Sequence, residues 1–216
     1  MKIYEKITKG TGIIDHYVFR HMVYFLIKIF GFRKIHPNWI VLFNLVFAGF
    51  CAYLISIGDL AIALIGSFLF IFFDMFDLLD GAVARVYGKT SKFGGFFDGL
   101  ADILAEILIL ISVGIYFSEL MKVLYLLIFI LVIIVINLRI KWILEDKEVQ
   151  INLLDLKVSS FMDKVKYLVI LATRNDSRKI IIFLGLLFSN IYLIIIYFVG
   201  LYFLSMVSSL GKIIGK

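Results

Sequence analysis

The sequence predicts an all-α, polytopic membrane protein with six transmembrane helices and an N-terminal amphipathic helix at the membrane interface. Hydrophobic residues make up 62% of the 216 residues and charged residues only 18%, and the mean hydropathy is +1.05. An ordinary soluble domain is about half apolar and about a quarter charged. Apolar runs near the ~20 residues that a bilayer-spanning helix needs recur along the chain, with short polar breaks between them.

The N-terminal region is expected to lie on the membrane rather than cross it. Residues 12–32 mix apolar and basic side chains, which is typical of an interfacial helix. We expect residues 1–36 to form this interfacial segment and residues 37–216 a six-helix bundle, as one membrane-embedded domain. Residues 1–15 are charged and lack the apolar stretch of a cleaved signal peptide, so we expect the N-terminus to be retained.

Three spans are predicted in the first half of the chain. Pro37 and Asn38 form a helix start signal, and the first span follows over residues 39–56. The second span begins at Leu60 and the third at Lys92. The second becomes polar toward its end and the third is polar at its beginning, so the two polar halves should form a helical hairpin.

Three more spans are predicted after residue 117. The fourth covers residues 120–142, and residues 145–174 read as a long, mixed interfacial connection. The apolar stretch 179–210 would be about 48 Å long as one helix, well beyond the ~30 Å hydrocarbon core. Two shorter spans that are separated near Ser189 and Asn190 fit the bilayer better.

The charge distribution predicts the orientation. The net charge is +6, and the N-terminal segment, the hairpin tip, the long connection and the C-terminal tail are basic, whereas the opposite loops carry almost no positive charge. Under the positive-inside rule these segments and both termini are cytoplasmic, which requires an even number of crossings. The basic residues form no separate domain with aromatic platforms, so we expect no nucleic-acid partner. The single cysteine, Cys51, cannot form a disulfide within the chain.

Four aspartates mark the candidate active site. Asp77 and Asp80 share one helix face, and Asp98 and Asp102 follow at a four-residue interval on the next helix. Carboxylates at membrane depth are costly and repel one another, so bound cations are the simplest explanation. An all-oxygen ligand set without His or Cys favours a hard cation, and we expect Mg²⁺ or Mn²⁺.

Small residues and one arginine accompany the acids. Gly81 and Ala84 lie on the face of Asp77 and Asp80, and Gly94 precedes Asp98 by one turn. They leave room for a phosphorylated ligand to approach the backbone. Arg85 adds a bidentate phosphate donor, so a metal-bridged pyrophosphate would suit this site.

The spacing of these eight residues resembles a known signature. The pattern Asp77-x-x-Asp80-Gly81-x-x-Ala84-Arg85, eight residues, Gly94-x-x-x-Asp98-x-x-x-Asp102 is similar to that of the CDP-alcohol phosphotransferases. Every fixed position agrees, although the signature covers only about an eighth of the chain. The resemblance implies a six-helix fold, usually a homodimer, with a polar cavity open to the cytoplasm.

The resemblance also implies roles for the site residues. The metal ligands of a two-ion site would be Asp77, Asp80, Asp98 and Asp102, and Asp102 would also serve as the catalytic base. CDP would be bound by Asp77, Asp80, Gly81, Ala84, Arg85, Gly94 and Asp98. The reaction implied is transfer of a phosphoryl-alcohol group from a CDP-alcohol to a hydroxyl acceptor with release of CMP, in phospholipid or inositol-phosphate-type synthesis.

The donor and the acceptor stay open at this point. A lipid donor such as CDP-diacylglycerol or CDP-archaeol, with a small hydroxyl or phosphorylated polyol acceptor, is favoured over a soluble CDP-alcohol with a lipid or small-molecule acceptor. Cations for an acceptor phosphate could come from Arg139, Arg174 and Arg178, which could equally be cytoplasmic anchors. Asp74 and Glu106 lie outside the signature, and each suits a buried polar role as well as a catalytic one.

A different class of function also places acids inside a helical bundle. A cation transporter would use them as an ion path, but it gives no reason for Gly81, Ala84 and Arg85 at their spacings. A cation transporter also gives no reason for the acids to lie near one face of the membrane. We therefore expect an integral membrane transferase in contact with lipids, with its active site facing the cytoplasm.

Overall fold

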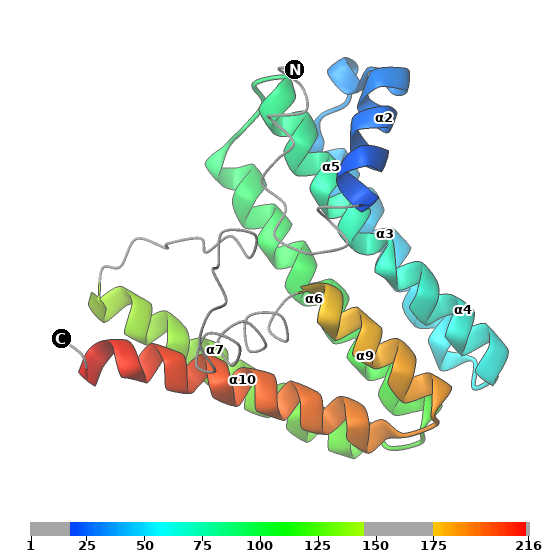
Figure 1. The fold of residues 1–216 in the computed structure, drawn as a ribbon, viewed down its shortest axis with the longest axis vertical. Helices are drawn as coiled ribbons and strands as arrows, with labels where there is room; N and C mark the ends of the chain where they lie inside the picture. The colour runs from blue at the N-terminus through cyan, green and yellow to red at the C-terminus, as the bar shows by residue number, and fades with distance from the viewer. Residues whose placement is uncertain (1–17, 145–174, 215–216) are drawn as a thin grey trace, which may run out of the picture. The chain divides into compact units, whose positions relative to one another are not determined.

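The structure is a computed structural model that describes residues 18–144 and 175–214. All regular secondary structure in these residues is helical, as predicted. The helices are α2 (Arg20–Phe30), the short 3-10 helix η2 (Phe32–Lys34), α3 (Pro37–Ser56), α4 (Leu60–Ile71), α5 (Phe73–Val86), α6 (Lys92–Tyr116), α7 (Leu120–Leu144), α9 (Asn175–Leu187) and α10 (Ile191–Ile214) (Figure 1). The chain forms two compact units, Met1–Phe117 and Ser118–Lys216.

Helix α3 is the centre of the first unit, where it packs against α4, α5 and α6. It starts at Pro37, whose missing N–H is not needed in the first helical turn. Asp59 caps the N-terminus of α4, because its side chain accepts a 3.0 Å hydrogen bond from the Ile62 N–H. Gly66 on α4 lies so close to α3 that a Cβ atom there would be 2.9 Å from the Cys51 carbonyl oxygen.

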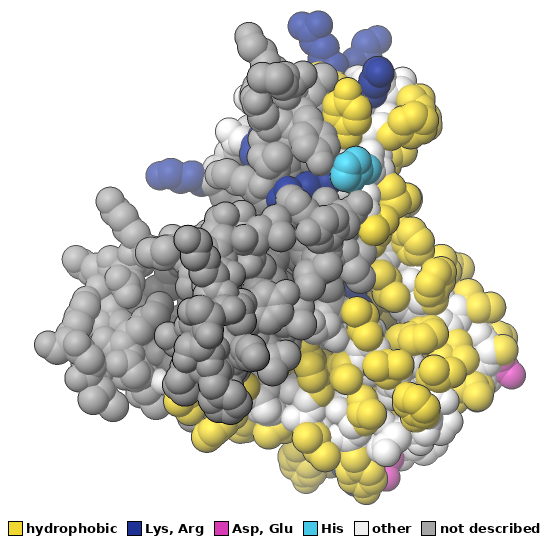
Figure 2. All heavy atoms as spheres, viewed as in Figure 1, with side chains coloured by type: hydrophobic (Ala, Val, Ile, Leu, Met, Phe, Trp, Pro, Cys, Tyr) yellow, Lys and Arg dark blue, Asp and Glu magenta, His cyan; other side chains and the backbone are white. Residues whose placement is uncertain are grey.

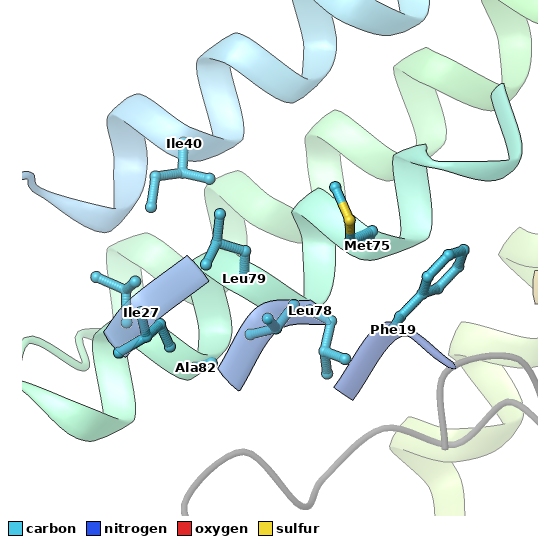
Figure 3. Close-up of a cluster of buried hydrophobic side chains, with 9 residues drawn as sticks. Phe19, Ile27, Ile40, Met75, Leu78, Leu79 and Ala82 are labelled. Atoms are coloured by element: carbon cyan, nitrogen blue, oxygen red, sulfur yellow. The ribbon is translucent and has the colours of Figure 1, made fainter. Parts of the chain in front are cut away.

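Helix α2 lies against α5. Its buried residues Arg20, Val23 and Ile27 recur at three- and four-residue intervals, which places them on one face. Apolar side chains of α2, α3 and α5 form a shared cluster there, seen in Figure 3 with Phe19, Ile27, Ile40, Met75, Leu78, Leu79 and Ala82. The predicted position of this helix at the membrane interface is not tested by these contacts and stays a prediction.

Within the described part of the chain, three helical segments are long and apolar enough to cross a membrane. They are Pro37–Ser56, Leu60–Val86, which combines α4 and α5, and Lys92–Tyr116. Large apolar side chains on α3 remain exposed, including Trp39, which is 67% exposed. Figure 2 shows hydrophobic side chains over the surface of α3 and α4, as expected of a lipid-facing surface.

The second unit contains α7, α9 and α10, and α10 packs against both of the others. The predicted break near Ser189 is present, because α9 ends at Leu187 and α10 begins at Ile191. The Asn190 Oδ1 atom caps α10 by accepting hydrogen bonds from the N–H groups of Tyr192 and Leu193. The apolar stretches found in α7 and α10, Leu120–Leu131 and Ile191–Leu204, are shorter than a membrane-spanning helix. The predicted crossings by the second unit are therefore not confirmed. The predicted interfacial connection lies outside the described residues.

Candidate active site

A tight turn joins the two helices that carry the signature. Helix α5 ends in a Schellman motif, in which Gly88 has a φ of +67° and the Lys89 N–H donates to the Ala84 carbonyl at 2.8 Å. Helix α6 then starts at Ser91, whose Oγ accepts a 2.9 Å hydrogen bond from the Gly94 N–H. Both ends are therefore fixed by local hydrogen bonds close to the signature residues.

The Lys89 side chain ties this turn to the segment before α3. Its Nζ atom donates to the carbonyl oxygens of Arg33, at 2.6 Å, and Ile35, at 2.9 Å. The two carbonyls lie more than 50 positions earlier in the chain. The turn is thus held next to the N-terminal end of α3.

Three of the four signature aspartates form a cluster that could hold a metal ion. One carboxylate oxygen from each of Asp77, Asp98 and Asp102 lies within 4.8 Å of the others, and all three side chains are partly buried. Oxygen ligands bind Mg²⁺ or Ca²⁺ at about 2.0–2.6 Å, so two oxygens on opposite sides of one ion are about 4–5 Å apart. The spacing and the donor chemistry fit a hard divalent cation.

The fourth aspartate lies beside this cluster rather than within it. Asp80 is 4% exposed, and its carboxyl group is adjacent to that of Asp98. Its Oδ2 atom is buried, and no described residue donates a hydrogen bond to it. A buried carboxylate oxygen of this kind is stabilised by a cation, so Asp80 could serve as a further ligand.

Arg85 is the nearby basic group on α5. Its guanidinium interacts electrostatically with Asp80, Asp77 and Asp98. It also lies directly over Gly81, because a Cβ atom at that position would be 3.0 Å from Arg85 Nη1. Three carboxylates near one guanidinium leave an excess of negative charge, which again favours bound cations.

A cavity of about 210 Å³ opens beside these groups. Helices α5 and α6 provide its signature residues, which are Asp80, Gly81, Ala84, Arg85, Gly94 and Asp98. Asp77 and Asp102 belong to the carboxylate cluster and are not among the lining residues. Asp98 belongs to both, so it joins the cavity to the cluster.

The cavity has further walls that the sequence interpretation did not include. They are made by Pro37, Asn38, Val41, Lys89, Thr90, Ser91 and Gly95. Pro37 and Asn38 were interpreted only as a helix start, yet a Cβ atom on Gly94 would lie 3.4 Å from Asn38 Oδ1. The sequence did contain a signal for this wall. Asn38 is a polar side chain at the start of the first span, and that start was predicted to lie at the same membrane face as the hairpin tip.

A comparison with family models identifies the chain. Residues 34–204 match the model described as CDP-alcohol phosphatidyltransferase. The chain belongs to this family. A search of curated proteins finds no significant match.

In this CDP-alcohol phosphatidyltransferase the signature residues lie together at the carboxylate cluster and the cavity beside it. The structure does not assign the other candidate residues to this site. Arg174 and the side chain of Arg139 lie outside the described residues, and Arg178 belongs to α9 in the second unit. Asp74 is buried. Neither Asp74 nor Glu106 lines the cavity or belongs to the carboxylate cluster. The acceptor site therefore remains a prediction.

Proposed function

We propose that this protein catalyses a metal-dependent transfer of a phosphoryl-alcohol group from a CDP-alcohol to a hydroxyl acceptor, with release of CMP. Family membership supports the donor class and the transfer reaction. The observation that carries the metal dependence is the cluster of Asp77, Asp98 and Asp102 beside a cavity lined by signature residues. The same membership favours a transferase over a cation transporter.

The metal site would comprise two ions, Mg²⁺ or Mn²⁺, with Asp77, Asp80, Asp98 and Asp102 as ligands. Bound metal would neutralise the charge of the diphosphate and of the departing CMP. Arg85 would donate two hydrogen bonds to a phosphate, and Gly81, Ala84 and Gly94 would let the diphosphate approach the two helices closely. Asp77, Asp80 and Asp98 would thus contribute to CDP binding through the metal.

Asp102 is proposed as the general base. It would take the proton from the acceptor hydroxyl, whose oxygen then attacks the β-phosphorus of the donor. A new phosphorus–oxygen bond to the acceptor forms as the bond to CMP breaks. The partly buried position of Asp102 in the carboxylate cluster supports a role next to the reacting phosphate.

The donor is proposed to be a lipid, CDP-diacylglycerol or CDP-archaeol, and the acceptor a small hydroxyl compound or phosphorylated polyol. Ligand pockets for drug-sized molecules are typically about 300–1,000 Å³, so a cavity of about 210 Å³ suits the polar part of such a donor. The lipid part would remain in the membrane. Arg139, Arg174 and Arg178 are proposed to bind an acceptor phosphate.

The membrane arrangement is proposed on similar grounds. In Figure 2, Lys and Arg side chains gather at the end of the first unit where α2 and the turn after α5 lie. Basic ends next to apolar helices face the cytoplasm, which supports a cytoplasmic active site and cytoplasmic termini. Six crossings, a single domain and a homodimer are part of the same proposal.

CMP release tests the reaction. Purified protein is incubated with a panel of CDP-alcohols and hydroxyl acceptors, with Mg²⁺ or Mn²⁺, and CMP is quantified. We expect release with one lipid donor, its loss on adding EDTA, and a decrease of about 10²–10⁴-fold in Asp102→Asn, the range that general base catalysis contributes.

Asp59→Asn is the matched control. Asp59 caps α4 at the end of the helix away from α5, and asparagine caps helices as well as aspartate does. This variant should retain full activity. Full activity of Asp102→Asn would refute the base assignment, and activity that survives complete metal removal would refute metal dependence.

A further inference from the structure

The second predicted span is interrupted one turn before the first signature aspartate. Helix α4 ends at Ile71 and α5 begins at Phe73. At the junction the Phe72 N–H donates to the Leu69 carbonyl at 2.9 Å, and the Met75 N–H donates to the Phe72 carbonyl at 3.0 Å. Both hydrogen bonds join residues three positions apart, as in a 3-10 helix, and they tighten the helix locally. Asp77 lies near the start of α5, which begins at this junction.

Asn44 on α3 binds the backbone at this junction. Its side chain is 4% exposed, and its Nδ2 atom donates a 3.2 Å hydrogen bond to the Phe73 carbonyl oxygen. In an α-helix the carbonyl of one residue accepts from the N–H four positions later. Because Phe73 begins α5, its carbonyl is the intrahelical acceptor for Asp77. Asn44 therefore holds the same oxygen that anchors the backbone of a proposed metal ligand.

The Asn44 side chain is a poor choice for packing alone. Its Oδ1 atom is buried, and no described residue donates a hydrogen bond to it. Burying an amide oxygen without a donor opposes folding, and an aliphatic side chain of similar size would avoid this penalty. A role in the site explains an asparagine here better than packing does.

We propose that Asn44 is a positioning residue for the metal site. By binding the Phe73 carbonyl it fixes the first turn of α5, so that the Asp77 carboxylate meets those of Asp98 and Asp102. The proposal rests on the proposed function, since it assumes that this cluster binds divalent metal. Residues that orient metal ligands from outside the first coordination sphere typically change metal affinity about 10–100-fold when they are replaced.

Direct metal binding tests this role. Mn²⁺ is titrated into the purified full chain in detergent, without substrate, and free Mn²⁺ is followed by electron paramagnetic resonance. We expect Asn44→Leu, which keeps the branching at Cγ and removes the donor, to weaken Mn²⁺ binding by about 10-fold or more. Asn44→Gln retains an amide on a longer stem and should give an affinity between those of Asn44→Leu and the unmodified chain.

Ser67→Ala is the matched control. The Ser67 hydroxyl is also buried, but it donates to the Leu64 carbonyl within α4 and does not join two helices. Its removal should leave Mn²⁺ affinity unchanged. Thermal unfolding midpoints are measured in parallel, because a purely structural role would lower the midpoint without a selective loss of Mn²⁺ affinity.

The outcomes separate the two proposals. If the unmodified chain binds no Mn²⁺, the proposed metal site fails. If it binds Mn²⁺ and Asn44→Leu binds equally well, the positioning role of Asn44 is refuted. Should Asn44→Leu not fold, Asn44→Ser decides the question, because serine adds no bulk and is too short to reach the Phe73 carbonyl.

Discussion

The Arg85 guanidinium lies over the Cα atom of Gly81, one helical turn earlier on α5. A Cβ atom at Gly81 would be 3.0 Å from Nη1 and 3.5 Å from Nη2 of Arg85. A larger residue at this position would require the guanidinium to shift, because the missing side chain of Gly81 leaves the surface on which the guanidinium rests. This contact gives a structural reason for a glycine four positions before Arg85 in this chain.

Replacement of Gly81 by alanine should therefore reduce activity without unfolding the protein. Arg85 is flexible at its far end, so the new methyl group would displace the guanidinium rather than the backbone. We expect a decrease of about 10–100-fold in kcat/KM for the CDP-alcohol, since small displacements of a binding group have large effects. The unfolding free energy should stay the same or rise, because alanine favours a helix over glycine by about 0.5–1 kcal/mol.

Gly99→Ala is the control for this prediction. Gly99 is an exposed residue of α6, and a Cβ atom there would contact nothing within 4 Å. The same change of residue type should leave CMP release unaffected. Equal activity of the two variants would show that the position of Arg85 above Gly81 does not matter for the reaction.

Local patterns in the sequence were sufficient to predict much of the site. Regular helical spacing places Asp98 and Asp102 on one stripe, and the structure brings both close to Asp77. The helix break near Ser189 was also predictable, because a single helix over residues 179–210 would be longer than the hydrocarbon core. These features depend on residues that are close in sequence.

Features that depend on tertiary contacts were harder to predict from the sequence. The spacing placed Asp80 with the other three aspartates, but nothing in it indicated that Lys89 would bind carbonyls more than 50 positions earlier. The interruption of the second span at Phe72 was also missed, because no glycine, proline or charged residue stands between Ser67 and Phe73 to mark a break.

Lys89 provides a second prediction. Replacement by methionine would keep the aliphatic stem and remove the donor to the carbonyls of Arg33 and Ile35. The turn would then be less firmly held beside the cavity, so we expect KM for the CDP-alcohol to rise. Hydrogen bonds contribute about 0.5–1.5 kcal/mol each, and partial exposure should keep the loss of stability near the lower limit.

Lys92→Met is a suitable comparison for Lys89. Lys92 is an exposed lysine three positions later, at the start of α6, and is not among the residues that line the cavity. Removing its charge should leave KM close to that of the unmodified chain. If both variants raise KM equally, general loss of positive charge, and not the Lys89 hydrogen bonds, would explain the effect.

The capping residue Ser91 allows a third prediction. Ser91→Ala removes the acceptor for the Gly94 N–H, and loss of an N-cap typically destabilises a protein by about 0.5–2 kcal/mol. Thermal unfolding should detect this loss. Ser91→Asn should restore stability without adding a charge, because asparagine caps helices as well as serine does. A rescue of stability without a rescue of activity would indicate that the hydroxyl, which also lines the cavity, contacts substrate.

The close contact between α3 and α4 allows a fourth prediction. A methyl group at Gly66 would meet the Cys51 carbonyl oxygen and the Leu54 Cβ atom, both at 2.9 Å. The first of these is backbone and cannot move independently of α3, so Gly66→Ala should destabilise the protein by about 1–3 kcal/mol. Gly49→Ala, within α3, adds a methyl group that meets nothing within 4 Å and should be neutral or slightly stabilising. Unfolding of both variants in the same detergent gives the comparison, and equal stability would mean that the two helices are not packed this closely.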